Sequence, residues 1–132
     1  VASSSMEFLG EMGELYDALE ISKFSIFIAD LGETLGTEPG KIRPVVVIQT
    51  DLLNDAHPST IVCPLTTNIL PKGQPIRVRV SPSRSSGLRQ DSEVMVDQIR
   101  TIDNRRFLRR IGRLTRGQKE RLARAVHLLV CE

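Results

Sequence analysis

Aromatic residues and cysteines are scarce in this 132-residue chain. Aromatic residues make up 4% and tryptophan is absent, which argues against a broad base-stacking platform of the kind that RNA-recognition modules use. Cys63 and Cys131 are the only cysteines, and without a CxxC pair or nearby histidines they indicate neither a disulfide framework nor a zinc site. No apolar run approaches the about 20 residues that span a bilayer. We therefore expect no membrane span, no metal and no cofactor.

The length and composition are those of one globular domain. Hydrophobic residues make up 40% and charged residues 26%, which is ordinary for a folded protein. We expect residues 1–5 to be a cloning remnant before Met6, followed by an acidic extension to residue 20, and residues 21–132 to form the domain. Apolar residues at helical spacing predict an acidic amphipathic helix within 7–20.

Charge is distributed unevenly along the chain. Residues 1–40 hold one base against eight acids, a net charge of −7, and residues 41–132 hold seventeen bases against eight acids, a net charge of +9. After position 40, arginine outnumbers lysine fourteen to three. A guanidinium group stays charged and binds phosphate through two parallel hydrogen bonds, so the basic part suits a nucleic acid as well as a solvated surface.

Alternating β-branched residues predict an antiparallel β meander or barrel. We expect strands at 24–30, 43–49, 60–65, 76–80, 93–96 and 111–114, and a mobile loop at 82–87. Asp103 can cap a short basic helix over 105–109. Thr115 and Gln118 form a capping box for a last helix. The apolar stripe of this helix suits a core or dimer contact and consists of Leu122, Val126, Leu129 and Val130.

Three motifs occur in order along the chain. Residues 36–44 read GTEPGKIRP and lead into VVVIQ, residues 61–67 read IVCPLTT, and residues 97–103 read DQIRTID. Together they resemble the MazF/PemK toxin family. The resemblance continues through Gly112-Arg113-Leu114 and the last helix, so it covers about residues 24–130, and three ordered motifs are far more specific than one.

The resemblance implies a fold and an activity. The fold is mainly β, an SH3-like antiparallel β-barrel with a C-terminal α-helix and a short additional helix. The activity is that of a type II toxin–antitoxin toxin, a sequence-specific, metal-independent endoribonuclease that cleaves single-stranded mRNA. It further implies a homodimer, a MazE-like antitoxin as partner, and the cytoplasm as compartment.

Family members carry an arginine before the proline and a threonine in the second motif as their main catalytic pair, and these match Arg43 and Thr66. A fixed guanidinium and a hydroxyl donor stabilise the extra negative charge of a phosphorus under attack by the RNA 2′-oxygen. The acid of the third motif, Asp97, is the natural candidate for general base, since arginine stays protonated and threonine is a poor base. The structural alternatives are a loop brace for Arg43, an ordinary strand residue for Thr66 and a turn acceptor for Asp97.

RNA contacts are expected from the first loop and from the neighbours of the catalytic residues. They are Thr37, Glu38, Lys41, Thr67, Asn68, Gln98 and Arg100. Some family members have an arginine and a histidine where this chain has Met95 and Thr37, so acid–base catalysis by those two groups is not available here. His57 and His127 are expected to be structural or exposed.

Two alternatives stay open. A CcdB-type toxin shares the barrel and acts by binding DNA gyrase without catalysis, but that family uses a tryptophan near its C-terminus and this chain has none. An inactive relative that binds only RNA or antitoxin is the second, because Phe24-Ser25 replaces the usual Gly-Asp before the first strand. The acidic segment at 7–20 could also dock on the RNA groove of its own chain or be unrelated sequence.

Overall fold

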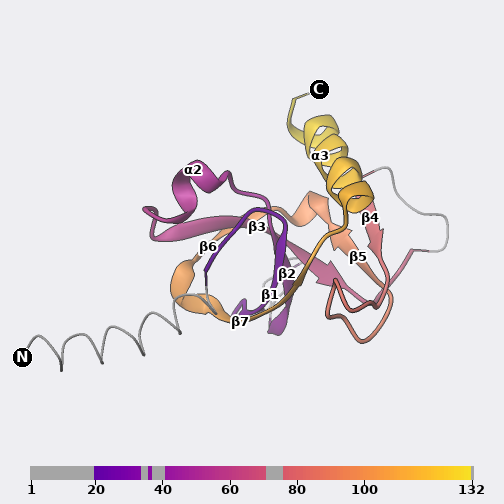
Figure 1. The fold of residues 1–132 in the computed structure, drawn as a ribbon, viewed down its shortest axis with the longest axis horizontal. Coiled ribbons are helices and arrows are strands. Elements are labelled where there is room, and N and C mark those ends of the chain that lie inside the picture. The colour runs from indigo at the N-terminus through magenta and orange to yellow at the C-terminus, as the bar shows by residue number, and fades with distance from the viewer. Residues whose placement is uncertain (1–19, 34–35, 37–40, 71–75, 132) are drawn as a thin grey trace, which may run out of the picture.

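The computed structural model describes residues 20–33, 36, 41–70 and 76–131. Seven strands and two α-helices form the domain (Figure 1). In chain order the elements are β1 (Ser25–Asp30), β2 (Ile42–Val47), α2 (Asp51–Asn54), β3 (Ser59–Thr66), β4 (Arg77–Val80), β5 (Ser92–Met95), the 3-10 turn η1 (Val96–Gln98), β6 (Arg100–Asp103), the 3-10 turn η2 (Asn104–Arg106), β7 (Phe107–Arg113) and α3 (Arg116–Val130).

The strands form one antiparallel sheet in the order β4-β5-β3-β2-β1-β7, and β6 also pairs with β3. On one edge β3 meets β2, and on the other it meets first β6 and then β5. Among the described strands no ladder joins β4 to β7, so the predicted barrel is open along this line. The expected mainly β architecture with a C-terminal helix is confirmed.

Two apolar clusters hold the sheet. The first, the helix-side cluster, packs Leu122 and Ala125 of α3 against the sheet residues Ile26, Val46 and Leu65, among others. The second, the Phe27 cluster, lies on the other face of β2 and contains Phe27, Val45, Val47, Val62 and Phe107, among others. Alternate residues of one strand enter different clusters, which is the period-2 geometry of a strand that is buried on both faces.

The Phe27 cluster explains why the predicted basic helix at 105–109 is wrong. The Asp103 carboxylate does accept the Arg105 backbone N–H at 2.8 Å, but the helical turn ends at Arg106 and Phe107 begins β7. Phe107 pairs with Ala29 of β1, and its ring lies 4.9 Å from that of Phe27. Strand pairing and ring burial therefore override the local cap. The sequence also missed β6, and the short helix lies instead at α2.

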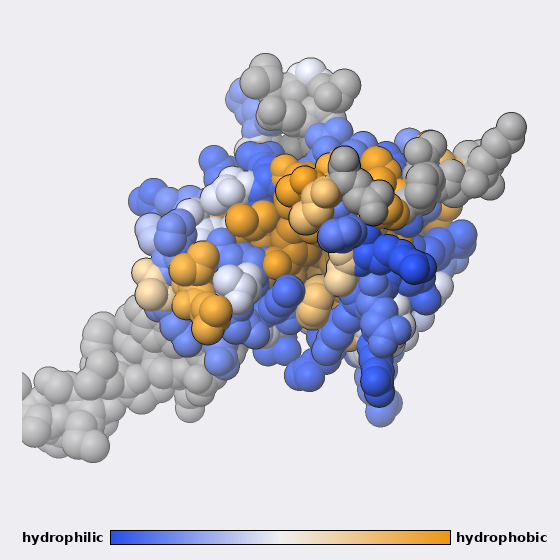
Figure 2. Space-filling model, turned by 90° about the horizontal axis from the view of Figure 1, so that it is seen from above, coloured by the Kyte–Doolittle hydropathy of each residue, from blue (hydrophilic) through white to orange (hydrophobic). Residues whose placement is uncertain are grey.

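The C-terminal helix begins as predicted. Thr115 and Gln118 make both hydrogen bonds of the capping box. The predicted apolar stripe is only half buried, because Leu122 is 0% exposed whereas Leu129 and Val130 are 38% and 63% exposed. Figure 2 shows apolar surface gathered in a hollow on the face that carries α2 and α3. The exposed large hydrophobic residues of these helices are Leu52, Leu53, Leu128, Leu129 and Val130.

Candidate active site

Strand register brings Arg43 and Thr66 to the same end of the sheet. Val45 lies opposite Pro64, Val46 opposite Cys63 and Val47 opposite Val62. Arg43 and Thr66 each lie two residues beyond the Val45–Pro64 pair, where this ladder ends, so both stand at the same end of the sheet, on the face shared by Val45 and Pro64. Both side chains are partly buried, so this strand end holds the predicted catalytic pair at the surface.

The Thr66 hydroxyl is oriented by the chain that follows it. Its Oγ1 accepts a hydrogen bond from the backbone N–H of Asn68 at 3.1 Å. A hydroxyl has one proton and two acceptor lone pairs, so acceptance from Asn68 leaves the Thr66 proton free to donate. The hydroxyl can therefore act as a positioned donor toward a phosphate oxygen.

Asp97 lies near Cys63, on the edge of β3 that pairs with β5 and β6. It sits in η1, between β5, which pairs with Leu65, and β6, which pairs with Val62. The pKa of the Cys63 thiol is raised to about 12, mainly by burial and to a smaller extent by the negative charge of Asp97. Asp97 is exposed and makes no side-chain hydrogen bond or ion pair with another described residue. Its carboxylate is thus open to solvent.

The carboxylate directly across from Thr66 belongs to Glu93, which the sequence analysis missed. Glu93 is the Cα partner of Thr66 and is 4% exposed. Its Oε1 accepts the Leu70 N–H at 3.0 Å and lies 3.6 Å from the Arg77 guanidinium. A buried carboxylate is costly unless it is paired and hydrogen-bonded. An acid inside an otherwise apolar predicted strand was the available signal.

The predicted RNA contacts fall into two groups. Lys41, Thr67 and Asn68 are exposed near the Arg43 end of the sheet. Gln98 and Arg100 are partly buried, and Arg100 lies opposite Val62, four residues before Thr66. At about 3.3 Å per residue this is a separation of roughly 13 Å along β3, so the two groups suit different nucleotides. Thr37 and Glu38 lie outside the described residues.

Lys41 has a left-handed backbone with φ of 65°, a conformation that costs a residue with a Cβ atom about 1–2 kcal/mol. Backbone hydrogen bonds hold it in place: the Leu31 N–H donates to the Lys41 carbonyl at 2.9 Å, and the Lys41 N–H donates to the Gly32 carbonyl. The base of the β1–β2 loop is therefore fixed two residues before Arg43.

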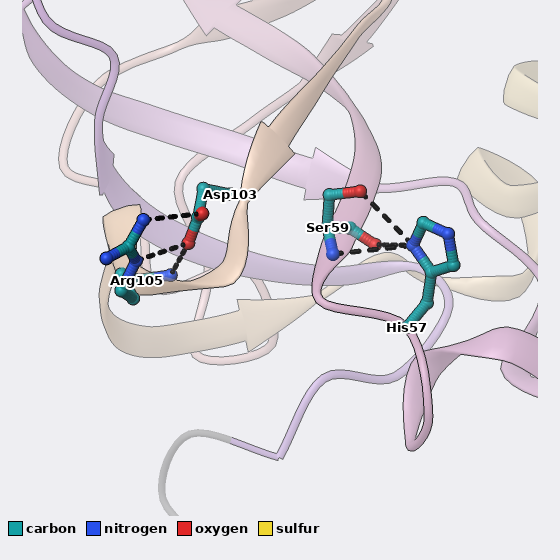
Figure 3. Close-up of polar contacts among 4 residues, drawn as sticks. All are labelled: His57, Ser59, Asp103 and Arg105. Atoms are coloured by element: carbon teal, nitrogen blue, oxygen red, sulfur yellow. Dashed lines mark hydrogen bonds and ion pairs between the residues drawn. The ribbon is translucent and has the colours of Figure 1, made fainter.

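The polar residues at the other end of β3 serve the fold (Figure 3). His57 Nδ1 lies 2.9 Å from the Ser59 carbonyl, and the Asp103 carboxylate receives the Arg105 guanidinium at 3.0 Å. The Arg105 hydrogen bonds lower the pKa of Asp103 to about 2. His57 and His127 are both exposed, as expected. Within the described ranges, no three His, Cys, Asp or Glu residues are grouped to hold a metal ion, and no helix is long and apolar enough to cross a membrane.

Comparison with known proteins identifies the family of this chain. Residues 22–130 match the family model for the PemK-like, MazF-like toxin of type II toxin-antitoxin systems. Endoribonuclease EndoA from Bacillus subtilis is 32% identical over 108 residues, which cover 82% of this chain and 92% of the relative.

Two solved structures have the same fold. Toxin MazF-mt6 from Mycobacterium tuberculosis superimposes with a TM-score of 0.67 at 30% identity, covering 79% of this chain and 93% of the toxin. MazF in the MazE-MazF structure from Deinococcus radiodurans gives 0.65 at 20% identity, with 85% and 96% covered. The family match over most of the domain establishes that this chain belongs to the PemK/MazF family of toxins.

Proposed function

We propose that this toxin is a sequence-specific endoribonuclease that cleaves single-stranded mRNA without a metal ion, using Arg43 and Thr66. The observation that carries the proposal is the β2–β3 register, from which Arg43 and the oriented hydroxyl of Thr66 share one end and one face of the sheet. Relatives that carry the name endoribonuclease support the activity. CcdB-like gyrase binding requires no such pair.

The chemistry follows from what these groups can donate. The 2′-hydroxyl gives its proton to a base, and its oxygen bonds to the adjacent phosphorus. The bond to the 5′-oxygen of the next nucleotide breaks, that oxygen takes a proton from water, and the products are a 2′,3′-cyclic phosphate and a 5′-hydroxyl. Negative charge increases on the phosphoryl oxygens during this step. Arg43 offers fixed positive charge and Thr66 offers a hydrogen-bond donor, and both stabilise the transition state without reorganisation.

We assign the general base to Asp97 in preference to Glu93. The Glu93 carboxylate is occupied by the Leu70 N–H and the Arg77 guanidinium, whereas Asp97 is exposed and has no such partner among the described residues. A base needs an unoccupied oxygen to receive the 2′-hydroxyl proton. Glu93 serves to position the segment that follows Thr66 by holding Leu70.

The substrate lies along the strand end and its flanks. Lys41, Thr67 and Asn68 contact the nucleotides at the cut, Gln98 and Arg100 contact nucleotides further along, and Thr37 and Glu38 belong to the same surface. Cationic side chains bind phosphates, while amides read base edges.

The proposed partners are a MazE-like antitoxin and a second copy of the chain. The MazE-MazF structure from Deinococcus radiodurans has the same toxin fold, which supports the antitoxin. The exposed apolar residues of α2 and α3 (Figure 2) support a homodimer, since a hollowed apolar face of this kind suits a protein interface. The cytoplasm is the proposed compartment, because both cysteines are free thiols, which is typical of a reducing environment.

The deciding experiment incubates the purified protein with a long RNA in EDTA and maps the cut sites and end groups. We expect cleavage at short recurrent sequences with 2′,3′-cyclic phosphate and 5′-hydroxyl ends. Intact RNA together with stalled gyrase would favour the CcdB-like alternative. Intact RNA that is nevertheless bound would favour an inactive relative.

A further inference from the structure

A recess lies next to the proposed catalytic pair, on the reverse face of the same strand end. Its volume is about 220 Å³, below the about 300–1,000 Å³ typical of pockets for drug-sized ligands, so it suits a fragment such as a single nucleobase. Four side chains give it an apolar lining, Ile28, Pro44, Leu88 and Ile111. Apolar walls can cover the faces of an unstacked base.

The wall formed by residues 87–90 is fixed in place, although the sequence predicted a mobile loop just before it. The Ser86 hydroxyl donates to the Ser81 carbonyl at 3.0 Å, and the Arg113 N–H donates to the Ser85 carbonyl at 2.8 Å. Gly87 has φ of 68°, and a Cβ atom there would lie 2.0 Å from the Ile111 carbonyl oxygen. Only glycine permits this close approach of loop and β7, so the pocket is formed before any ligand binds.

Positive charge at the pocket is not neutralised. Arg89 and Arg109 line it, and both are exposed. Neither side chain makes a hydrogen bond or ion pair with any described residue. The acid that follows in the chain, Asp91, pairs with Arg79 at 3.4 Å. Two unpaired guanidinium groups beside an apolar recess complement a base flanked by phosphates.

The polar lining can also read a base. The Gln90 amide carries both a donor and an acceptor, and Thr67 and Ser92 add hydroxyl groups to the same lining. An acidic peptide could use the two arginines, but it would have no use for this mixed donor and acceptor set over an apolar floor. The lining therefore favours a nucleotide.

The pocket adjoins the proposed cut site through the chain itself. Pro44 follows Arg43, and Thr67 follows Thr66, so two lining residues are direct neighbours of the catalytic pair. Successive residues of a strand point to opposite faces. An RNA strand that passes over the end of β3 would thus place its scissile phosphate on one face and a neighbouring base on the other.

We propose that this pocket binds one unstacked base of the RNA substrate next to the cleaved phosphate, with Arg89 and Arg109 on its flanking phosphates and Gln90 on its edge. The inference rests on the proposed ribonuclease function and adds a specificity-determining subsite to it.

The test compares Arg109→Ala and Gln90→Ala with Arg113→Ala, a matched control that removes a charge from the same strand but does not line the pocket. Cleavage is measured on RNAs randomised at each position around the mapped cut. We expect Arg109→Ala to raise KM about tenfold, to leave kcat unchanged and to reduce the salt dependence of binding by about one phosphate contact. Gln90→Ala should relax preference at one position by about fivefold to 100-fold, and Arg113→Ala should leave every positional preference unchanged.

A binding assay separates failure of the pocket from failure of the ribonuclease function. In the Arg43→Ala background, which is expected not to cut, binding of a labelled single-stranded RNA is measured for the same variants. Position-specific loss of binding supports the pocket even if the wild-type protein cuts no RNA. The proposal is overturned if both pocket variants keep the wild-type positional preference and RNA binding. It is also overturned if the variants lose binding only to an acidic peptide of residues 7–20 and not to RNA. Because Gln90 and Arg109 are exposed, unchanged melting temperatures are expected to confirm folding.

Discussion

The two ends of β3 both carry polar side chains, but these side chains have different partners. At the Ser59 end the side chains bond to one another: the Thr60 hydroxyl donates to Asn104 at 2.6 Å, and the Gln49 amide donates to Asn54 at 3.0 Å. Thr60 is completely buried. At the Thr66 end, the side chains of Asp97, Arg89 and Arg109 have no hydrogen-bond or ion-pair partner among the described residues.

This difference separates the polar groups that stabilise the fold from those that are available to a ligand. A buried polar group without a partner costs about 1–3 kcal/mol, so the groups at the Ser59 end are committed to each other. Throughout the described part of the chain, every buried side-chain nitrogen and oxygen has a partner. Exposed charges bear no such cost, and those at the Thr66 end are available to the proposed RNA substrate.

The largest expected effect is at the Thr66 end. Arg43→Ala should lower the cleavage rate about 10²–10³-fold, because it removes a preorganised positive charge from the transition state. The melting temperature should change little, since Arg43 is only partly buried. Single-turnover cleavage and thermal melting measure the two quantities. Arg105→Ala at the Ser59 end is the matched control and should cut at the wild-type rate; equal losses in both variants would remove the distinction between the ends.

Asp97→Asn should lower the rate about 10²-fold, as expected for loss of a general base. It should also lose the acidic limb of the pH–rate profile that we expect for the wild-type protein. A pH–rate profile over the acidic limb is the measurement. Glu93→Gln keeps an oxygen acceptor for Leu70 and is expected to retain that limb. If Glu93→Gln loses the limb and Asp97→Asn keeps it, the base is Glu93.

Asn104→Ala tests the Ser59 end. The substitution leaves the buried Thr60 hydroxyl and the His57 carbonyl without the hydrogen bonds that they make now, so the free energy of unfolding should fall by about 1–3 kcal/mol. Cleavage per folded molecule should not change. Denaturant unfolding and a rate corrected for the folded fraction provide the check. Asn68→Ala, an exposed amide at the other end, is expected to change stability by less than about 0.5 kcal/mol.

The smallest effect concerns the thiols. Burial and the charge of Asp97 raise the pKa of Cys63 from 9.0 to about 12, so this thiol stays neutral and unreactive at pH 8, whereas Cys131 is exposed. A thiol reagent should modify one cysteine in the folded chain and two after denaturation. Because the folded pKa is raised, the contribution of Cys63 to stability is fully present below pH 9 and is lost as the pH rises toward 12.

Asp97→Asn gives the matched control for the thiol measurement. It removes the smaller cause of the raised pKa and keeps burial, the larger one. Cys63 should therefore remain unreactive in the folded variant. Rapid modification of two thiols in either folded protein would contradict the buried position of Cys63.

Most strands and the capping box at Thr115 could be predicted from the sequence and are confirmed, and the sequence also singled out Arg43 and Thr66 as the candidate pair. These are local: β-branched alternation reports strands directly, and the capping box spans four residues. The strands at 60–65, 76–80 and 93–96 were predicted almost within their observed bounds. The motif residues were identified because their order along the chain is itself specific.

Other features depend on contacts between residues far apart in the chain, and only the tertiary structure shows them. Phe107 became a strand residue because Phe27 and Ala29 bury it, against the local signal of a cap. Glu93 lies opposite Thr66 because β5 pairs with β3. The proposed base pocket forms where β1, β2, β7 and the 87–92 segment converge. Such neighbours are set by strand register and packing, which a single sequence does not specify.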